Sequence, residues 1–165
     1  MGKICAFLGN DYDFMHGRKR ERRPRIWLRE KVKEQIINLI ENEDVTTFFV
    51  GEIGGFEEDA YDAVLEVKEV YPHIHITLVI SKITELHPVG EDISNYIYKG
   101  KPCDDFIYPD KSAMGYKRLS IVYRNRYIIE NTDFIIAYNE YHGKAYEFCK
   151  QAKGKDVKVI ELAER

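Results

Sequence analysis

Charged side chains and a glycine flank a short apolar run, Phe134 to Tyr138, in the last third of a 165-residue sequence. The flanking residues are Arg124, Arg126, His142, Gly143, Lys144 and Glu147. Such a run is typical of a strand in a parallel sheet covered on both faces, and open sheets of this kind bind ligands beyond their strands' carboxyl ends. Arginine forks suit phosphate oxygens, and a carboxylate can bind a ribose hydroxyl or act as a general acid or base. The pattern therefore predicts a ligand site at this strand.

The two arginines lie two positions apart, so on a helix their side chains point in different directions. We expect one of them to face the site and the other to serve the surface or an ion pair, and both Arg124 and Arg126 are candidates. Tyr138 can form one wall of a base-stacking pocket, and His142 can form a hydrogen bond with a ligand. The alternatives are ordinary packing for the tyrosine, an exposed position for the histidine, and a helix-stabilising surface role for Glu147.

A glycine-containing turn, Gly51-Glu-Ile-Gly54-Gly55, follows the apolar run Thr46 to Val50 and precedes apolar residues at helical spacing. Glycines between a strand and a helix let backbone N–H groups approach a phosphate at the helix N-terminus. We therefore count Gly51, Gly54 and Gly55 as ligand-binding candidates. The alternative is a purely structural turn, because glycine is the ordinary residue of tight turns and the three acidic residues that follow would repel a phosphate.

The segment after the first predicted strand carries the densest basic run, Arg18-Lys-Arg-Glu-Arg-Arg-Pro-Arg25. The ligand-binding candidates here are Gly9 and Asn10 at the end of the strand, with Arg18 and Arg20 in the run. Guanidinium groups suit phosphate, although such clusters often remain a solvated face. The formal net charge of -3 gives no general attraction to nucleic acid, so nucleic-acid binding is disfavoured and any anion site must come from local clustering.

Strand and helix patterns alternate along the sequence. Apolar runs predict strands at Lys3 to Leu8, Thr46 to Val50, Ile74 to Ile80, Phe106 to Tyr108, Phe134 to Tyr138 and Val157 to Leu162. Helical spacing predicts helices at Pro24 to Asn42, Ala60 to Val70, Ile121 to Asn131 and Lys144 to Lys153. The stretch from Ser81 to Ser120 is otherwise mixed and rich in proline. The alternation predicts one domain over residues 1–165, an α/β three-layer sandwich with a mainly parallel sheet and helices on both faces.

Composition limits the remaining possibilities. No stretch approaches about 18 uncharged apolar residues and no signal-peptide pattern occurs, so we expect a cytoplasmic protein with no membrane partner. The three cysteines, Cys5, Cys103 and Cys149, are far apart and form no CxxC pair, which indicates structural thiols. His73 and His75 would share one face of a predicted strand, but no further ligand has metal spacing, so no metal and no cofactor are assigned.

Four motifs suggest a family. They are Phe48-Phe-Val-Gly51-Glu-Ile-Gly54-Gly55-Phe56, Tyr71-Pro-His-Ile, Tyr123-Arg-Asn-Arg-Tyr and Asn131-Thr-Asp-Phe-Ile-Ile-Ala-Tyr138. Together they resemble a small bacterial branch of the SLOG superfamily, over nearly the whole chain. That superfamily has a Rossmann-like α/β fold and includes the Lonely Guy phosphoribohydrolases, the Smf/DprA DNA-processing proteins and sensor domains that bind nucleotide-derived signals. The resemblance implies a Rossmann-like fold, a nucleotide-derived ligand and a homodimer or higher homo-oligomer.

The resemblance also assigns roles to residues. In the phosphoribohydrolases, a catalytic arginine and an aspartate before the strand precede a Pro-Gly-Gly-x-Gly-Thr-x-x-Glu loop, and Arg124, Asp133, Gly143 and Glu147 fall in step with that pattern. The resemblance therefore implies Arg124 and Glu147 as catalytic residues, with Gly143 and Lys144 in the phosphate loop.

The sequence departs from the family at several of these positions. Asn139-Glu-Tyr141 stands where the family has Pro-Gly-Gly, and Lys144 stands in place of the threonine. Gly9-Asn-Asp11 stands where relatives often carry Gly-His-Arg, and Glu57 replaces an aspartate that commonly follows Gly-Gly-Phe. Such changes indicate either a changed ligand or a loss of catalysis.

Three hypotheses follow. The first is a sensor or sequestering module that binds a nucleotide or nucleotide-derived small molecule at the carboxyl edge of the sheet. The second is an enzyme resembling the phosphoribohydrolases, in which Arg124 and Glu147 assist cleavage of the N-glycosidic bond of a nucleoside monophosphate. The third, single-stranded nucleic-acid binding through the basic run, is the least favoured because of the net charge of -3.

Overall fold

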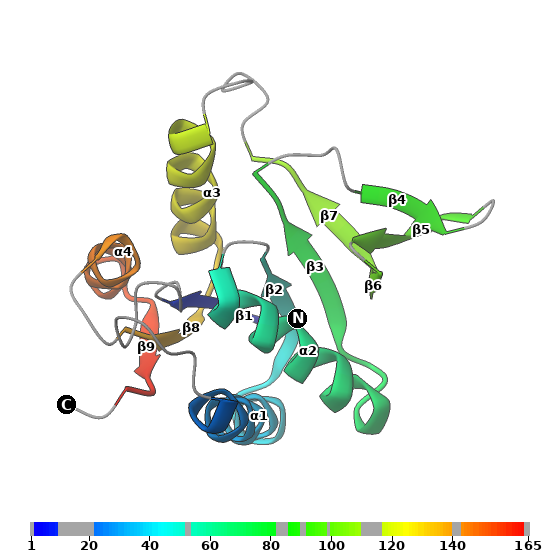
Figure 1. Ribbon diagram of the computed structural model, residues 1–165, viewed down its shortest axis with the longest axis horizontal. Helices are drawn as coiled ribbons and strands as arrows, with labels where there is room; N and C mark the ends of the chain where they lie inside the picture. The colour runs from blue at the N-terminus through cyan, green and yellow to red at the C-terminus, as the bar shows by residue number, and fades with distance from the viewer. Residues whose placement is uncertain are drawn as a thin grey trace.

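The computed structural model describes residues 2–9, 22–51, 54–81, 86–89, 92–98, 100–109, 117–139 and 143–163, which form a Rossmann-like α/β sandwich (Figure 1). Within this part of the chain, a six-stranded sheet has the order β7-β3-β2-β1-β8-β9, and every neighbouring pair is parallel. Its strands are β1 (Lys3–Gly9), β2 (Val45–Val50), β3 (His75–Val79), β7 (Asp105–Ile107), β8 (Phe134–Tyr138) and β9 (Lys158–Glu161). The predicted fold class is therefore confirmed.

The helices cover both faces of this sheet (Figure 1). They are α1 (Arg22–Asn42) and α2 (Gly54–Val70) on one face, with α3 (Lys117–Asn131) and α4 (Lys144–Lys153) on the other. Successive side chains of a strand point to opposite faces. In β1, Cys5 and Phe7 accordingly pack with α1 and α2, whereas Ala6 and Leu8 pack with α3 and α4. Burial on both faces explains why the central strands read as continuous apolar runs.

A second, smaller sheet lies between β3 and β7 in the sequence and was not predicted. It consists of β4 (Leu86–Val89), β5 (Asp92–Tyr98) and β6 (Lys101–Cys103), paired antiparallel in that order. The sequence hides these strands because β4 contains Pro88, which argues against a strand, and because β6 has only 3 residues. The strand expected at Phe106 to Tyr108 is present, one residue earlier, as β7.

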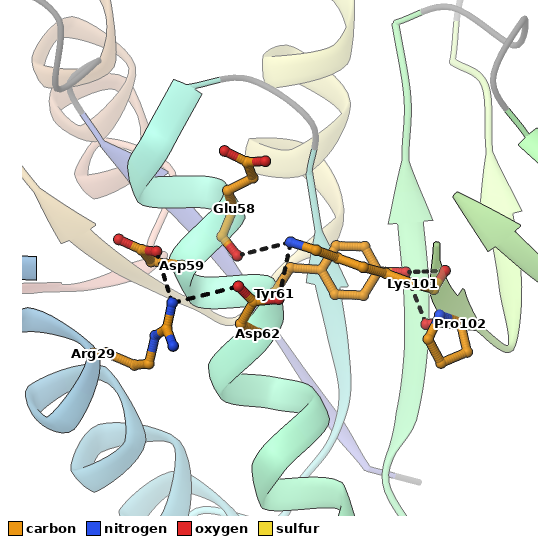
Figure 2. Close-up of polar contacts among 7 residues, drawn as sticks. All are labelled: Arg29, Glu58, Asp59, Tyr61, Asp62, Lys101 and Pro102. Atoms are coloured by element: carbon orange, nitrogen blue, oxygen red, sulfur yellow. Dashed lines mark hydrogen bonds and ion pairs between the residues drawn. The ribbon is translucent and has the colours of Figure 1, made fainter. Parts of the chain in front are cut away.

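The last strand of the small sheet, β6, is joined to α2 by contacts of a tyrosine and a lysine (Figure 2). The hydroxyl of Tyr61 donates to the carbonyl oxygen of Pro102 at 2.8 Å, with the carbonyl oxygen of Lys101 3.3 Å away. In return, Lys101 Nζ lies 2.9 Å from Asp62 Oδ1 and 5.3 Å from the centre of the Tyr61 ring. These contacts fix the position of β6 relative to the helix that follows the glycine turn.

Arg29 of α1 holds the same helix from its other side (Figure 2). Its Nη2 lies 3.1 Å from Asp59 Oδ1 and 3.4 Å from Asp62 Oδ2. Asp59 is only 1% exposed, so the arginine supplies the positive charge that a buried carboxylate needs. The first turns of α2 are therefore held by ion pairs with Arg29 on one side and by contacts with β6 on the other.

One expectation about the histidines is wrong. His73 lies in the turn before β3, and the strand begins at His75, so the two side chains do not share a strand face. His75 Nε2 instead lies 3.1 Å from Asp105 Oδ1. Among the residues whose placement the structure describes, no group of three or more His, Cys, Asp or Glu side chains is arranged to hold a metal ion. None of the helices within the same residues is long and apolar enough to cross a membrane.

Candidate functional site

The order of the strands defines where a ligand site is expected. β1 pairs with both β2 and β8, and in the β1–β8 pair Gly9 lies opposite Tyr138 at the carboxyl ends. From there the chain continues to α1 on one face and to α4 on the other. In open α/β sheets, this reversal of winding opens the crevice in which ligands bind.

Arg124 is a fully buried charge at the same edge of the sheet. It lies on α3 and is 1% exposed. Its Nε donates to the carbonyl oxygen of Val79, the last residue of β3, at 3.1 Å, and its Nη1 donates to Asn125 Oδ1 at 2.6 Å. Its Nη2 forms an ion pair with Glu57 Oε1 in the first turn of α2. Each of the three guanidinium nitrogens thus has a partner, and the charge is neutralised inside the protein.

Gly51, directly after β2, has a packing reason to be glycine. A Cβ at this position would overlap both Glu57 Oε1 and Arg124 Nη2. The ion pair therefore lies directly against the backbone at the end of β2. The sequence predicted Gly51 as part of a phosphate cradle, and the structure brings it together with Arg124, with the carboxylate of Glu57 beside both.

Gly54 and Gly55 begin α2 at the same edge. Gly54 has a φ of 79°, a left-handed conformation that favours glycine, so the tight entry into the helix requires this residue type. Their backbone N–H groups belong to the first turn, where a helix carries partial positive charge. Glu57 occupies the same turn and is 3% exposed.

Aromatic rings pack against the carboxyl ends of β1 and β8. A Cβ at Gly9 would overlap the Phe56 ring, and the rings of Phe56 and Tyr138 stack with 6.0 Å between centroids. Tyr138 is 6% exposed and belongs to the core on the α1 and α2 face. The ring of Tyr138 thus contributes to packing, and its role as a wall of a base-stacking pocket stays a prediction.

Helix α4, the next helix after β8, carries the other predicted catalytic residue, Glu147. Gly143 is the N-cap of α4, and its carbonyl oxygen accepts a hydrogen bond from Glu147 N–H at 3.1 Å. Glu147 is exposed in the first turn of α4. It is therefore accessible to solvent, whereas Arg124 is enclosed.

The two arginines of α3 point apart, as their spacing predicts. Arg126 is exposed, and its guanidinium lies 5.6 Å from the centre of the Tyr123 ring on the surface of α3. The structure does not bring it together with Arg124. Asn10, Arg18, Arg20 and His142 lie outside the described residues, as does the side chain of Lys144.

Sequence reasoning missed the residue that fixes the chain where it leaves β8. Asn139 is fully buried, and its backbone N–H and its Nδ2 each donate to the carboxylate of Glu161 at 2.9 Å. Its Nδ2 also lies 3.5 Å from Cys149 Sγ. Burial raises the pKa of the Cys149 thiol to about 11, with the Asn139 contact acting in the opposite direction. Cys149 is therefore a structural thiol, and a polar residue directly after a buried strand was the only signal for Asn139.

Asp133 lies at the opposite edge of the sheet, before β8. Its Oδ2 accepts a hydrogen bond from Ile4 N–H at 2.9 Å, and its own N–H donates to the carbonyl oxygen of Ile4. These bonds join the amino ends of β1 and β8. The aspartate therefore aligns the two central strands rather than contributing to the carboxyl edge.

Comparison with known proteins gives no further assignment. No protein-family model matches the chain, and no curated protein matches it.

Proposed function

We propose that the chain is a SLOG-type binding module for a nucleotide or nucleotide-derived molecule, bound at the carboxyl edge of the sheet. The observation that carries the proposal is the position of Arg124, a buried arginine at the end of β3 beside the glycine that follows β2. Burying an arginine is costly unless its charge is compensated, and arginine is well suited to bind phosphate. Its place at the edge where Rossmann-like folds bind nucleotides supports a ligand role.

A thermal-shift screen with nucleotides, cyclic dinucleotides and ADP-ribose derivatives tests the proposal, because a ligand stabilises the form that it binds. We expect at least one phosphate-bearing compound to raise the melting temperature, with the matching nucleoside giving a smaller shift. Arg124→Lys keeps the charge but loses the planar fork, so it should weaken the effect, whereas Arg126→Lys on the surface should not. If none of these compounds stabilises the wild-type protein, the proposal is wrong.

The enzymatic alternative has one observation in its favour: Glu147 is exposed in the first turn of α4, the helix that follows β8 in the sequence. A carboxylate there could stabilise the oxocarbenium-like state of N-glycosidic cleavage. Chromatography of each stabilising compound after incubation tests this alternative. Breakdown that Glu147→Gln abolishes would establish the hydrolase, and stabilisation without breakdown would leave the sensor or sequestering module.

Two further parts of the proposal concern partners. We propose a cytoplasmic homodimer or higher homo-oligomer, which light scattering coupled to size-exclusion chromatography would show as a mass of at least twice that of the chain. Binding of single-stranded nucleic acid is disfavoured by the net charge of -3, and any affinity that depends on the basic run should fall steeply with salt.

A further inference from the structure

The partners of Arg124 fall into two kinds. Val79 and Asn125 contact Nε and Nη1 through neutral oxygen atoms, and they orient the guanidinium without neutralising it. Glu57, in contrast, supplies a full negative charge at Nη2. It does so from α2, on the face of the sheet opposite to α3. The carboxylate thus occupies the position on Arg124 that an external anion would take.

The backbone at Gly51 leaves room for this ion pair. Because Gly51 has no Cβ, both Glu57 Oε1 and Arg124 Nη2 lie against the end of β2. A side chain at this position would fill the space that the two charged groups now use. The end of β2 therefore lies against one cationic and one anionic side chain, those of Arg124 and Glu57.

We propose that Glu57 is an internal competitor at this site, so that a ligand phosphate binds Arg124 by displacing the Glu57 carboxylate. This inference rests on the proposed function, because it takes the phosphate to be part of the nucleotide-derived ligand. Displacement leaves Arg124 in place, since its bonds to Val79 and Asn125 do not involve Glu57. A phosphate and the carboxylate cannot share the guanidinium at low cost, because like charges in a buried site repel strongly.

The competitor sets which ligands the site accepts. A neutral nucleoside gains nothing from Arg124 while Glu57 neutralises it. A phosphate monoester gains because it carries more charge than a carboxylate and can bridge two guanidinium nitrogens. The proposal therefore predicts weak phosphate recognition in the wild-type chain and stronger recognition once the carboxylate is neutralised.

Isothermal titration calorimetry with AMP and adenosine, at constant ionic strength, measures this difference. Glu57→Gln keeps the size of the side chain and removes its charge, and Glu58→Gln, on the exposed neighbouring residue, is the matched control. We expect Glu57→Gln to raise the affinity for AMP by about tenfold or more and to leave that for adenosine within about twofold. Glu58→Gln should change neither affinity, and adding Arg124→Lys to Glu57→Gln should remove the gain.

An unchanged or weakened AMP affinity in a folded Glu57→Gln protein would overturn the inference, as would an equal gain for adenosine. The wild-type chain gives a second readout, free of any folding defect, in the ¹⁵N resonance of Arg124 Nε, assigned by its loss in Arg124→Lys. Saturating AMP should shift this resonance and adenosine should not; no shift with AMP would again overturn the inference.

The failures of the two proposals are distinguishable. A nucleotide that stabilises the wild-type protein while Glu57→Gln gains no phosphate affinity supports the proposed function and rejects the competitor. A wild-type protein that no nucleotide stabilises rejects the proposed function and, because the inference rests on that function, the competitor as well.

Discussion

Glu57 and Arg124 come from helices on opposite faces of the sheet and meet at its carboxyl edge. Both side chains are almost completely buried, with exposures of 3% and 1%. A buried ion pair adds little stability over an apolar pair of similar volume, but removing only one of the two charged partners is strongly destabilising. The pair therefore links α2 to α3 across the ends of β2 and β3, although the apolar side chains of the two helices pack on opposite faces of the sheet.

The first prediction concerns stability. Arg124→Ala leaves Glu57 buried without its cation, and we expect a loss of about 3–5 kcal/mol in the free energy of unfolding. Arg126→Ala, on the exposed side of the same helix, is the control, and it should cost no more than about 1 kcal/mol through its contact with the Tyr123 ring. Urea denaturation followed by circular dichroism measures both values. Equal losses would show that the buried pair contributes nothing specific.

The sequence was sufficient for the elements whose side chains are buried on both faces. Phe134–Tyr138 was predicted with its observed bounds, because a strand that packs against helices on either side must be apolar throughout. The small sheet was missed for the converse reason. Its strands lie outside the three layers, β4 contains Pro88, and β6 is too short to show a period.

The sequence predicted residues of the candidate site only where a local motif marks the residue itself. Arg124 was identified from its motif, but its partner Glu57 lies 67 positions away, and the sequence indicated only that an acid after the glycine turn would repel a phosphate. The pairing of Asn139 with Glu161 depends on the alignment of β8 with β9, which no local pattern reveals. Contacts between distant elements are set by strand order, and strand order was not predicted.

A second prediction concerns the glycine beneath the ion pair. Gly51→Ala places a methyl group where Glu57 Oε1 and Arg124 Nη2 now lie, so we expect a loss of about 1–3 kcal/mol from overpacking. Gly154→Ala is the matched control, because Gly154 has a φ of -69° and its Cβ would come no closer than 3.4 Å to Gln151 O. That variant should be neutral or gain about 0.4–1 kcal/mol. In thermal denaturation, Gly51→Ala should therefore lower the melting temperature and Gly154→Ala should leave it unchanged or raise it. A similar melting temperature for both variants would contradict the close approach at Gly51.

A third prediction concerns the attachment of the small sheet to α2. Tyr61→Phe removes the hydroxyl that donates to Pro102, and we expect a loss of about 1 kcal/mol together with faster amide exchange in β6. Tyr71→Phe is the control, since its hydroxyl lies 3.2 Å from Glu41 at an exposed position and should leave the exchange of β6 unchanged. Hydrogen exchange with mass spectrometry provides the readout. Unaltered exchange of β6 in Tyr61→Phe would show that the small sheet does not depend on this bond.

The last prediction is a dependence of stability on pH that arises at Asp104. Its Oδ2 lies 2.9 Å from Lys68 Nζ and accepts a hydrogen bond from Ile76 N–H at 2.8 Å. Partial burial opposes ionisation of the carboxyl, but the hydrogen bond from Ile76 and the Lys68 ion pair outweigh it, so the pKa of Asp104 is lowered. A carboxyl whose pKa is lower in the folded chain than in the unfolded chain stabilises the fold above its unfolded pKa of about 3.9. This contribution is lost as the pH falls through the folded value.

Asp104→Asn should therefore be less stable than the wild-type protein at pH 7, and the difference should shrink as the pH falls below about 4. Urea denaturation at a series of pH values measures the difference directly. Glu69→Gln, which neutralises an exposed acid on α2, should keep a small and constant difference over the same range. If the difference in free energy of unfolding between the wild type and Asp104→Asn is as large at pH 2 as at pH 7, packing around residue 104, rather than its charge, accounts for the loss of stability.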